Sequence, residues 1–426
     1  MKTILMIAPN FPPTSAVGGI RSLKFAKYLP GFGWKPIVIT LSAQDQKLSD
    51  ATLLSELPPQ VEIHRPGYFN YRKYLRGDIR KLLKPLERRY SFPDNYVHWN
   101  QAALRYIRKN ILGLKKIDLI YASMGPHSAL LLAQELKRRT GLPLVLDFRD
   151  PFSFSQYSVL DHKQNYQQRA RRIEAAVLPA ADHINVVTRE WQERYAALYP
   201  QIAAKMSAIP NGYDETDFAA LPAKRRQAVF TVGYNGTFSR LSPLAPLATA
   251  IEEIHRHKGI AIRLSIASAT REKKMRSRFR GLYDRGLIEF KGHLPHRESL
   301  ANLHQSDIVA LTLNDIPATR GQIPAKTFEY LRIDRPILLL HKEHGQLADI
   351  LRCTRTGISV PIDDHSRIVE TLLDLQQRWV RQRLEHQPDW QAIAKFERQQ
   401  LTAALAAIFD RLCGAAQAGA VAANVT

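Results

Sequence analysis

Lys326 and Glu329 are the two residues whose chemistry can be argued most closely from the sequence. They lie three residues apart just after Pro324, which is typical of a first helical position, so they should share one face of a first helical turn. A helix N-terminus attracts phosphate through its free N–H groups, and a lysine adds a full positive charge. The nearby carboxylate could accept hydrogen bonds from a ribose diol. The pair therefore predicts a nucleotide site, and the alternative is a surface ion pair worth about 0.2–0.5 kcal/mol.

A strand, a loop and a helix must position this pair. Residues 307–313 form a short apolar run rich in β-branched residues, and residues 314–323 have the Pro, Gly and polar content of a loop. The helix should then end before Pro336, where the next strand begins. Ligands of parallel α/β sheets lie beyond the carboxyl ends of the strands, so the loop and the first helical turn should face a ligand.

Three other expected strand ends carry residues that could bind a ligand. Gly18 and Gly19 precede a helix and would let the backbone approach a ligand closely, although a glycine pair in such a turn is usually structural. His127 lies between a strand and a helix, where a neutral imidazole could contact a sugar hydroxyl or simply serve as a loop or capping residue. Arg149 and Asp150 could orient an acceptor, or could only pair with each other.

Residues 65–116 concentrate positive charge and aromatic rings. This segment has 14 Lys+Arg and 3 Asp+Glu, and residues 68–99 interleave cations with eight aromatic side chains. Such a composition is typical of a protein segment that lies on a membrane surface. Each Lys or Arg near anionic lipid contributes roughly 1 kcal/mol of attraction to that surface. The alternatives are a solvated basic face and, less in keeping with the rest of the chain, a surface for nucleic acid. We predict a peripheral contact with an anionic membrane and no nucleic-acid partner.

Motifs in both halves of the chain match one family in their order along the sequence. They are PNFPP at 9–13 with Gly18 and Gly19, NGYD at 211–214, KGHLP at 291–295, IPAKTFEYL at 323–331 and RPIL at 335–338. This set resembles glycosyltransferase family 4, whose GT-B fold consists of two Rossmann-like domains that face a cleft. The resemblance implies that Glu329 holds the donor ribose. Many members carry a second glutamate eight positions earlier for the donor sugar, and this sequence has Gly321 there.

The resemblance also implies which residues meet the donor diphosphate. The segment NGTFSR at 235–240 matches a glycine loop with a following cation, which makes Arg240 a candidate. Members often carry a lysine about six residues later, where this chain has no charge, so Lys326 or Arg320 should neutralise the second phosphate charge. The predicted sites are catalytic His127, Arg240 and Lys326; donor-binding Gly236, Thr237, Arg240, Arg320, Lys326 and Glu329; and acceptor-binding Gly18, Gly19, Arg149 and Asp150. No metal site and no cofactor is predicted.

Length and composition indicate a globular protein of two or three domains. The chain has 426 residues, 45% hydrophobic content and only two cysteines, which exclude a disulfide framework and fit a reducing compartment. Polar residues and prolines interrupt the apolar start too early for a secretory signal, and no apolar run reaches the length of a membrane span. The expected location is the cytoplasm, at the inner face of the plasma membrane.

The predicted fold is α/β, with two doubly wound Rossmann-like domains. The domains should span residues 1–222 and 223–388, followed by a helix over 389–412 that crosses back to the first domain and a disordered tail over 413–426. The predicted strands cover residues 3–8, 36–41, 61–64, 118–122, 144–148, 183–187, 230–234, 262–267, 288–290, 307–313, 336–340 and 357–360.

The predicted function is transfer of a sugar from a UDP- or GDP-sugar to a glycan or lipid-linked acceptor in surface polysaccharide or lipopolysaccharide synthesis. Stabilisation of the leaving nucleoside diphosphate by fixed cations should be the main catalytic effect. Retention of anomeric configuration and independence of metal are implied by the family resemblance only. The alternatives are a GT-B sugar-nucleotide epimerase and a non-enzymatic nucleic-acid binder.

Overall fold

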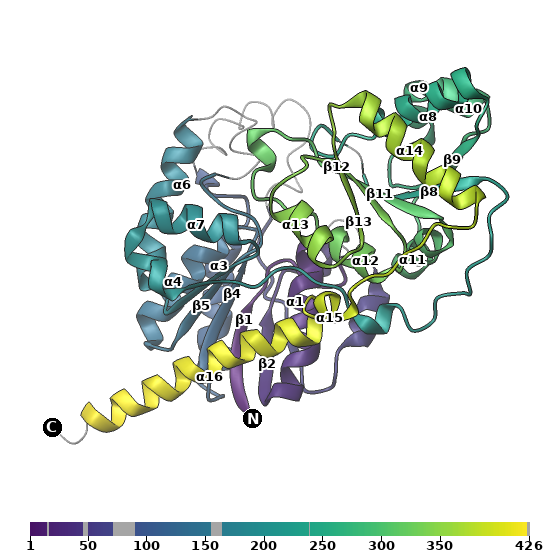
Figure 1. Cartoon of the computed structure of the whole chain (residues 1–426). Helices are drawn as coiled ribbons and strands as arrows, with labels where there is room; N and C mark the ends of the chain where they lie inside the picture. The colour runs from purple at the N-terminus through teal and green to yellow at the C-terminus, as the bar shows by residue number, and fades with distance from the viewer. Residues whose placement is uncertain (15–16, 46–49, 71–89, 155–163, 238, 424–426) are drawn as a thin grey trace. The chain divides into compact units, whose positions relative to one another are not determined.

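The computed structural model describes residues 1–14, 17–45, 50–70, 90–154, 164–237 and 239–423 (Figure 1). The chain forms two compact units, each an α/β structure built on a parallel sheet, so the predicted fold class is confirmed. Unit 1 comprises Met1–Asn211 and the C-terminal segment from Arg398, and unit 2 comprises Gly212–Glu397. The first unit therefore ends before the boundary that the sequence predicted at residue 222.

Unit 1 has a seven-stranded sheet in the order β3-β2-β1-β4-β5-β6-β7. Its strands are β1 Lys2–Ile7, β2 Trp34–Ile39, β3 Glu62–His64, β4 Leu119–Met124, β5 Leu144–Phe148, β6 His183–Val186 and β7 Met206–Ala208. Every strand pair in it is parallel. The strand order reverses between β1 and β4, and ligands of doubly wound sheets bind at such a switch point.

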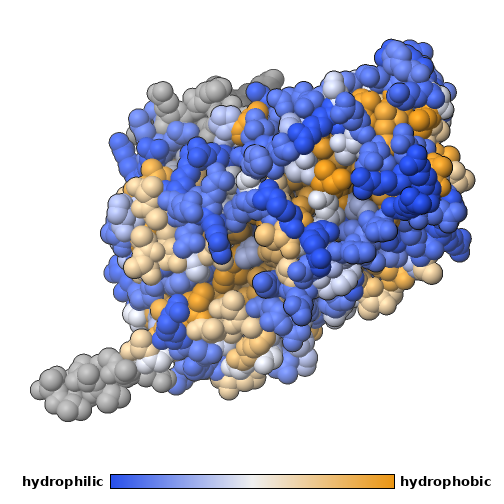
Figure 2. Space-filling model, in the orientation of Figure 1, coloured by the Kyte–Doolittle hydropathy of each residue, from blue (hydrophilic) through white to orange (hydrophobic). Residues whose placement is uncertain are grey.

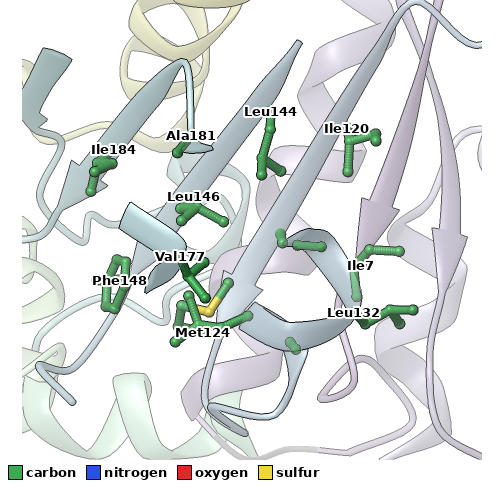
Figure 3. Packing of buried hydrophobic residues seen from close by; sticks show 14 of the residues in the cluster. Ile7, Ile120, Met124, Leu132, Leu144, Leu146, Phe148, Val177, Ala181 and Ile184 are labelled. Atoms are coloured by element: carbon green, nitrogen blue, oxygen red, sulfur yellow. The ribbon is translucent and has the colours of Figure 1, made fainter. Parts of the chain in front are cut away.

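Helices cover both faces of this sheet and bury its apolar side chains. They are α1 Val17–Tyr28, α3 Val97–Ile107, α4 Ala129–Thr140, α6 Gln164–Val177, α7 Arg189–Leu198 and α16 Arg398–Ala423. Figure 3 shows one core, where Ile7, Ile120 and Leu146 of the strands pack with Leu132 of α4 and Val177 of α6. These strands are apolar along their length because helices pack on both sides of a parallel sheet.

The C-terminal helix α16 packs on unit 1 through one apolar face. Leu405 and Phe409 are fully buried in a cluster with Ile4 and Trp34, and the rings of Trp34 and Phe409 lie 5.4 Å apart. The sequence predicted one helix over residues 389–412. The structure has two helices there instead, α15 over Trp390–Ala394 and α16 over Arg398–Ala423. Between the two helices the Phe396 carbonyl accepts a hydrogen bond from the Tyr213 N–H at 3.1 Å. The disordered tail expected over residues 413–426 stays a prediction, although α16 continues to Ala423.

Unit 2 has a six-stranded parallel sheet in the order β10-β9-β8-β11-β12-β13. Its strands are β8 Phe230–Asn235, β9 Ile262–Ala267, β10 Ile288–Phe290, β11 Ile308–Thr312, β12 Ile337–His341 and β13 Gly357–Pro361. Its helices are α8 Ala245–Lys258, α9 Glu272–Arg278, α10 Arg280–Asp284, α11 His296–Gln305, α12 Lys326–Arg332, α13 Gln346–Cys353, α14 His365–Val380 and α15. The predicted strands at 262–267 and 288–290 coincide with β9 and β10. None of the helices in the described ranges combines the length and apolar character that a membrane span requires.

A buried ion pair ties α1 to the centre of the sheet in unit 1. Arg21 of α1 donates to both carboxylate oxygens of Asp147 on β5, at 2.9 and 2.7 Å, and both side chains are almost fully buried. The Tyr121 hydroxyl donates to the same carboxylate at 2.7 Å, and Arg21 also donates to the carbonyls of Ile209 and Pro210. The pair is fully hydrogen-bonded, so loss of one partner would leave an uncompensated charge in the core.

We expect Asp147→Asn to lower the free energy of unfolding by about 3–5 kcal/mol, because Arg21 would remain charged and buried without its carboxylate. The control is Asp410→Asn, which breaks the exposed Lys2–Asp410 pair and should cost under about 1 kcal/mol. Urea unfolding of the three proteins measures both effects. Equal destabilisation by the two substitutions would contradict the importance of the buried pair.

Candidate functional site

Asn235, the last residue of β8, makes the hydrogen bonds that bring two helices of unit 2 to one strand end. Its side-chain amide donates to the carbonyl and the hydroxyl of Ser299 on α11, each at 2.6 Å. Its backbone N–H donates to the Tyr330 hydroxyl of α12 at 3.0 Å, and its carbonyl accepts from the Lys326 ammonium at 3.2 Å. The first turns of α11 and α12 are therefore held beside the carboxyl end of a central strand, where such sheets bind ligands.

The Lys326 ammonium contacts the Tyr234 ring as well as the Asn235 carbonyl. Its Nζ lies 4.2 Å from the centroid of the Tyr234 ring, a cation–π contact. Burial would raise the pKa of Tyr234, but the Lys326 ammonium and the hydroxyls of Ser242 and Thr312 bring it below its ordinary value. The ammonium is thus positioned in advance for an anion that approaches the end of β8.

Gly236 allows the chain to leave β8 next to this ammonium. Its φ is +118°, a conformation that side-chain-bearing residues rarely adopt, and a Cβ there would lie 3.5 Å from the Lys326 Nζ. Thr237 and Arg240 follow in the same loop, and both are exposed. The Asn314 amide donates to the Arg240 carbonyl at 3.1 Å, which ties this loop to the one that follows β11.

The helix that carries Lys326 begins later than the sequence predicted. Pro324 accepts a turn hydrogen bond from the Thr327 N–H at 2.9 Å, but α12 starts at Lys326 and has only seven residues. Such a short helix aligns few peptide dipoles, so its N-terminus adds little to the field. The lysine charge must therefore account for most of the attraction for phosphate.

Glu329 pairs with a histidine that the sequence did not single out. The His296 Nε2 lies 2.9 Å from the Glu329 Oε1, and both side chains are partly exposed. In the part of the chain that the structure describes, no ion pair joins Glu329 to Lys326, so the surface-pair alternative is not observed. His296 follows the KGHLP segment and begins α11. It lies 33 residues from Glu329 in the chain, so no local sequence pattern could have predicted that the two side chains meet.

The loop after β11 carries the other predicted donor residues. Arg320 is exposed on this loop. Gly321 has a φ of +73°, so a glutamate at this position would adopt a strained left-handed backbone. The local backbone therefore suits the glycine that replaces the first family glutamate.

Arg149 occupies the space beside Gly18, which the structure places in the first turn of α1 and not in the preceding loop. Its Nε donates to the Met124 carbonyl at 2.8 Å, and the guanidinium also donates to the Gly125 carbonyl. A Cβ on Gly18 would lie 1.6 Å from the Arg149 Nη1, so Gly18 makes room for this guanidinium. Asp150 is exposed, and within the described residues it forms no ion pair with Arg149. Acceptor binding by these residues stays a prediction.

Gly19 leaves little room for a side chain because Thr14 lies close to it. A Cβ there would lie 2.9 Å from the methyl group of Thr14, a residue that precedes α1 in the chain. The glycine pair is thus required for local packing, whether or not a ligand also approaches it.

His127 stacks on Phe152, a residue that the sequence analysis missed. The two ring centroids lie 4.4 Å apart with an interplanar angle of 17°. Its Nε2 is buried and has no hydrogen-bond partner among the described residues. Burial, helped by the Arg149 charge, lowers the pKa of His127 to about 4, so the ring is neutral near pH 7. A neutral imidazole with an unused polar atom suits the predicted contact with a hydroxyl.

Buried polar groups hold the loop that supplies Phe152. The Phe152 N–H donates to the Tyr195 hydroxyl at 3.0 Å, and that hydroxyl donates to the Glu174 carboxylate at 2.9 Å. Glu174 is fully buried, and burial raises its pKa. No sequence motif marks this network, because its members come from the loop after β5 and from the two helices α6 and α7.

We expect the stability of the protein to fall between about pH 6.5 and pH 4 partly through His127. The unfolded chain protonates this ring near pH 6.5 and the folded chain only near pH 4, so the unfolded state binds more protons in this window. The loss should reach about 2 kcal/mol at pH 5. His127→Gln should remove that part of the pH dependence in urea unfolding and leave the slope between pH 7 and 9 unchanged. An identical pH dependence in both proteins would contradict the assignment.

Comparisons with known proteins agree with the fold and the motifs. Residues 19–217 match the model of Glycosyltransferase Family 4. Similar solved structures include a glycosyltransferase from Rickettsia africae, Alr3699/HepE of Anabaena in complex with UDP and glucose, and the lipopolysaccharide outer core galactosyltransferase WaaB.

The structural similarity extends over almost the whole chain. In the same order, the TM-scores are 0.61, 0.61 and 0.59 at 12%, 15% and 14% identity. Each alignment covers 96% of this chain and 98%, 100% and 100% of the other chain. No curated protein matches the sequence. The chain has a GT-B fold, and its residues 19–217 carry a Glycosyltransferase Family 4 domain.

Proposed function

We propose that this glycosyltransferase moves a sugar from a nucleotide-sugar donor to a glycan or lipid-linked acceptor, with retention of configuration. The observation that carries the proposal is the presentation of Lys326 and Glu329 at the carboxyl end of β8, a cation for phosphate beside a carboxylate for a ribose diol. A UDP-sugar is the preferred donor, because the similar Alr3699/HepE structure holds UDP and glucose. The resemblance to WaaB supports an acceptor from lipopolysaccharide or another surface polysaccharide.

Departure of the nucleoside diphosphate is the step that the site assists. Negative charge builds on the diphosphate as the bond to the sugar breaks, and fixed cations stabilise that charge without reorganising. Lys326 is already held by the Asn235 carbonyl and the Tyr234 ring, so its ordering costs little when the donor binds. Arg240 and Arg320, both exposed, are proposed to close on the same group. Neutral His127 is proposed to bind a hydroxyl of the transferred sugar or of the acceptor.

We place this enzyme in the cytoplasm, in peripheral contact with the inner face of the plasma membrane. Most of the cations predicted for that contact, including Arg72, Lys73, Arg76 and Arg80, lie outside the described residues. The family match favours sugar transfer over the epimerase and nucleic-acid alternatives.

We expect UDP, at 100 times its Kd, to stabilise the protein by roughly 2.7 kcal/mol in a thermal-shift screen of nucleoside diphosphates and nucleotide sugars. Arg240→Ala and Lys326→Ala should each weaken UDP binding by about tenfold or more and change uridine binding little, because each removes a phosphate partner. A double-mutant cycle should show coupling if both cations contact one diphosphate. Equal losses for UDP and uridine would contradict the phosphate assignment.

We expect Glu329→Ala to abolish a preference for UDP over 2′-deoxy-UDP, because the carboxylate would no longer accept from the ribose diol. A hydrogen bond to a charged group is worth about 1.5–3 kcal/mol, so the wild-type preference should be about tenfold or more. His296→Ala should reduce the preference in part by releasing Glu329, and His296→Gln, which retains an N–H donor, should restore it. A preference that survives Glu329→Ala in a folded variant would show that another group binds the ribose.

A further inference from the structure

Residues 271–285 hold almost all of the charge excess of unit 2. Gly212–Glu397 contains 28 Lys+Arg and 22 Asp+Glu. Residues 271–285 alone contain 7 Lys+Arg and 2 Asp+Glu. The remainder of the unit has 21 Lys+Arg and 20 Asp+Glu, so its charge is nearly balanced. A charge excess that served only solubility would have no reason to gather in fifteen consecutive residues.

The fold turns these cations outward on α9 and α10. Met275, Phe279 and Leu282 face the core, where their side chains are at most 7% exposed. The exposed cations are Arg271, Lys273, Lys274, Arg276, Arg278, Arg280 and Arg285. In Figure 1 the helices α8, α9 and α10 lie together at the upper right, and Figure 2 shows hydrophilic residues at the tip of this corner with a hydrophobic patch directly below them.

Only part of this charge is neutralised by neighbouring carboxylates. Three of the cations form exposed ion pairs, listed here: Arg276 with Glu272 at 3.1 Å, Arg280 with Asp284 at 3.5 Å and Arg285 with Glu252 at 3.4 Å. Among the described residues, the other four have no carboxylate within ion-pair distance: Arg271, Lys273, Lys274 and Arg278. We call these four residues the α9 cations.

A recess beside the α9 cations adds hydrogen-bond donors. It lies between α8 and the helices α9 and α10, with a volume of about 390 Å³. Its polar lining comes from Thr249, Ser277, Arg278, Arg280 and the paired carboxylate Glu252. Guanidinium and hydroxyl groups around a recess of this size suit the phosphate of a lipid headgroup.

We propose that the α9 cations and this recess form a contact of unit 2 with an anionic lipid bilayer. Charge complementarity favours this partner, because cations near an anionic bilayer attract it without any requirement for sequence or shape. Single-stranded nucleic acid is less suited, since its binding uses exposed aromatic rings for base stacking. Here Phe279 is buried, and Arg276 lies 5.0 Å from the centroid of the half-buried Tyr283 ring. The contact is independent of residues 65–116 and of the donor site.

The first test measures sedimentation of the full chain with vesicles of phosphatidylglycerol and phosphatidylcholine. Each cation near an anionic surface contributes about fivefold in affinity. The triple variant K273Q/K274Q/R278Q should therefore bind at least tenfold more weakly, and about a hundredfold more weakly at most. The matched control R381Q/R383Q/K395Q removes the same charge from exposed positions elsewhere in unit 2 and should bind nearly as the wild type does. Equal losses in the two triple variants, or no loss in either, would overturn the proposal.

The second test locates the contact in the wild-type protein. Brief acetylation followed by mass spectrometry should show protection of Lys273 and Lys274 by anionic vesicles, no protection by neutral vesicles, and unchanged reactivity of exposed Lys395. UDP binding and thermal stability of the triple variant should match the wild type, which separates this result from a failure of the donor site. Protection by duplex DNA or RNA but not by vesicles would identify a nucleic-acid surface and overturn the membrane contact.

Discussion

The hydrogen bonds of Asn235 are the interaction on which the candidate donor site depends. This residue is 8% exposed and uses its amide, its N–H and its carbonyl to hold α11, α12 and the Lys326 ammonium at the end of one strand. Buried polar groups are costly when unpaired, so these contacts support one another. Lys326 and Glu329 lie on a helix whose position this strand end determines, and His296 begins the other helix that it holds. The site is thus organised by backbone and amide contacts before any ligand arrives.

Two arginines of unit 1, the buried Arg21 and the half-buried Arg149, have different electrostatic consequences. Arg21 is neutralised by Asp147, so it joins α1 to β5 and adds little net field. Arg149 instead donates to the carbonyls of Met124 and Gly125, and its positive charge helps to lower the pKa of His127. Arg21 therefore links α1 to the sheet, whereas Arg149 assists burial in keeping a candidate ligand-binding histidine neutral.

Both halves of the chain concentrate their positive charge in one segment. Residues 65–116 carry 14 cations and 3 acidic residues, and residues 271–285 carry 7 and 2. An enzyme whose acceptor is anchored in lipid benefits from weak, reversible adsorption, because adsorption raises the rate of encounter with acceptors in the bilayer. Many weak charge contacts suit that purpose better than a single apolar anchor, since they release the protein after each turnover.

The sequence by itself determined the fold class, the order of the strands along the chain and the family, because these depend on local apolar runs, turn residues and short motifs. It also singled out Lys326 and Glu329 as candidate donor-binding residues, because a spacing of three residues is a local property of a helix. Only the tertiary structure decided their partners. Asn235, Tyr234 and His296 reach this pair through the parallel order of the strands. Separations of 33 residues for His296 and Glu329 and 91 for Asn235 and Lys326 carry no periodic signal. The break between α15 and α16 likewise appears only in the tertiary structure, where the chain between them contacts Tyr213, because the helical pattern of residues 389–412 does not mark it.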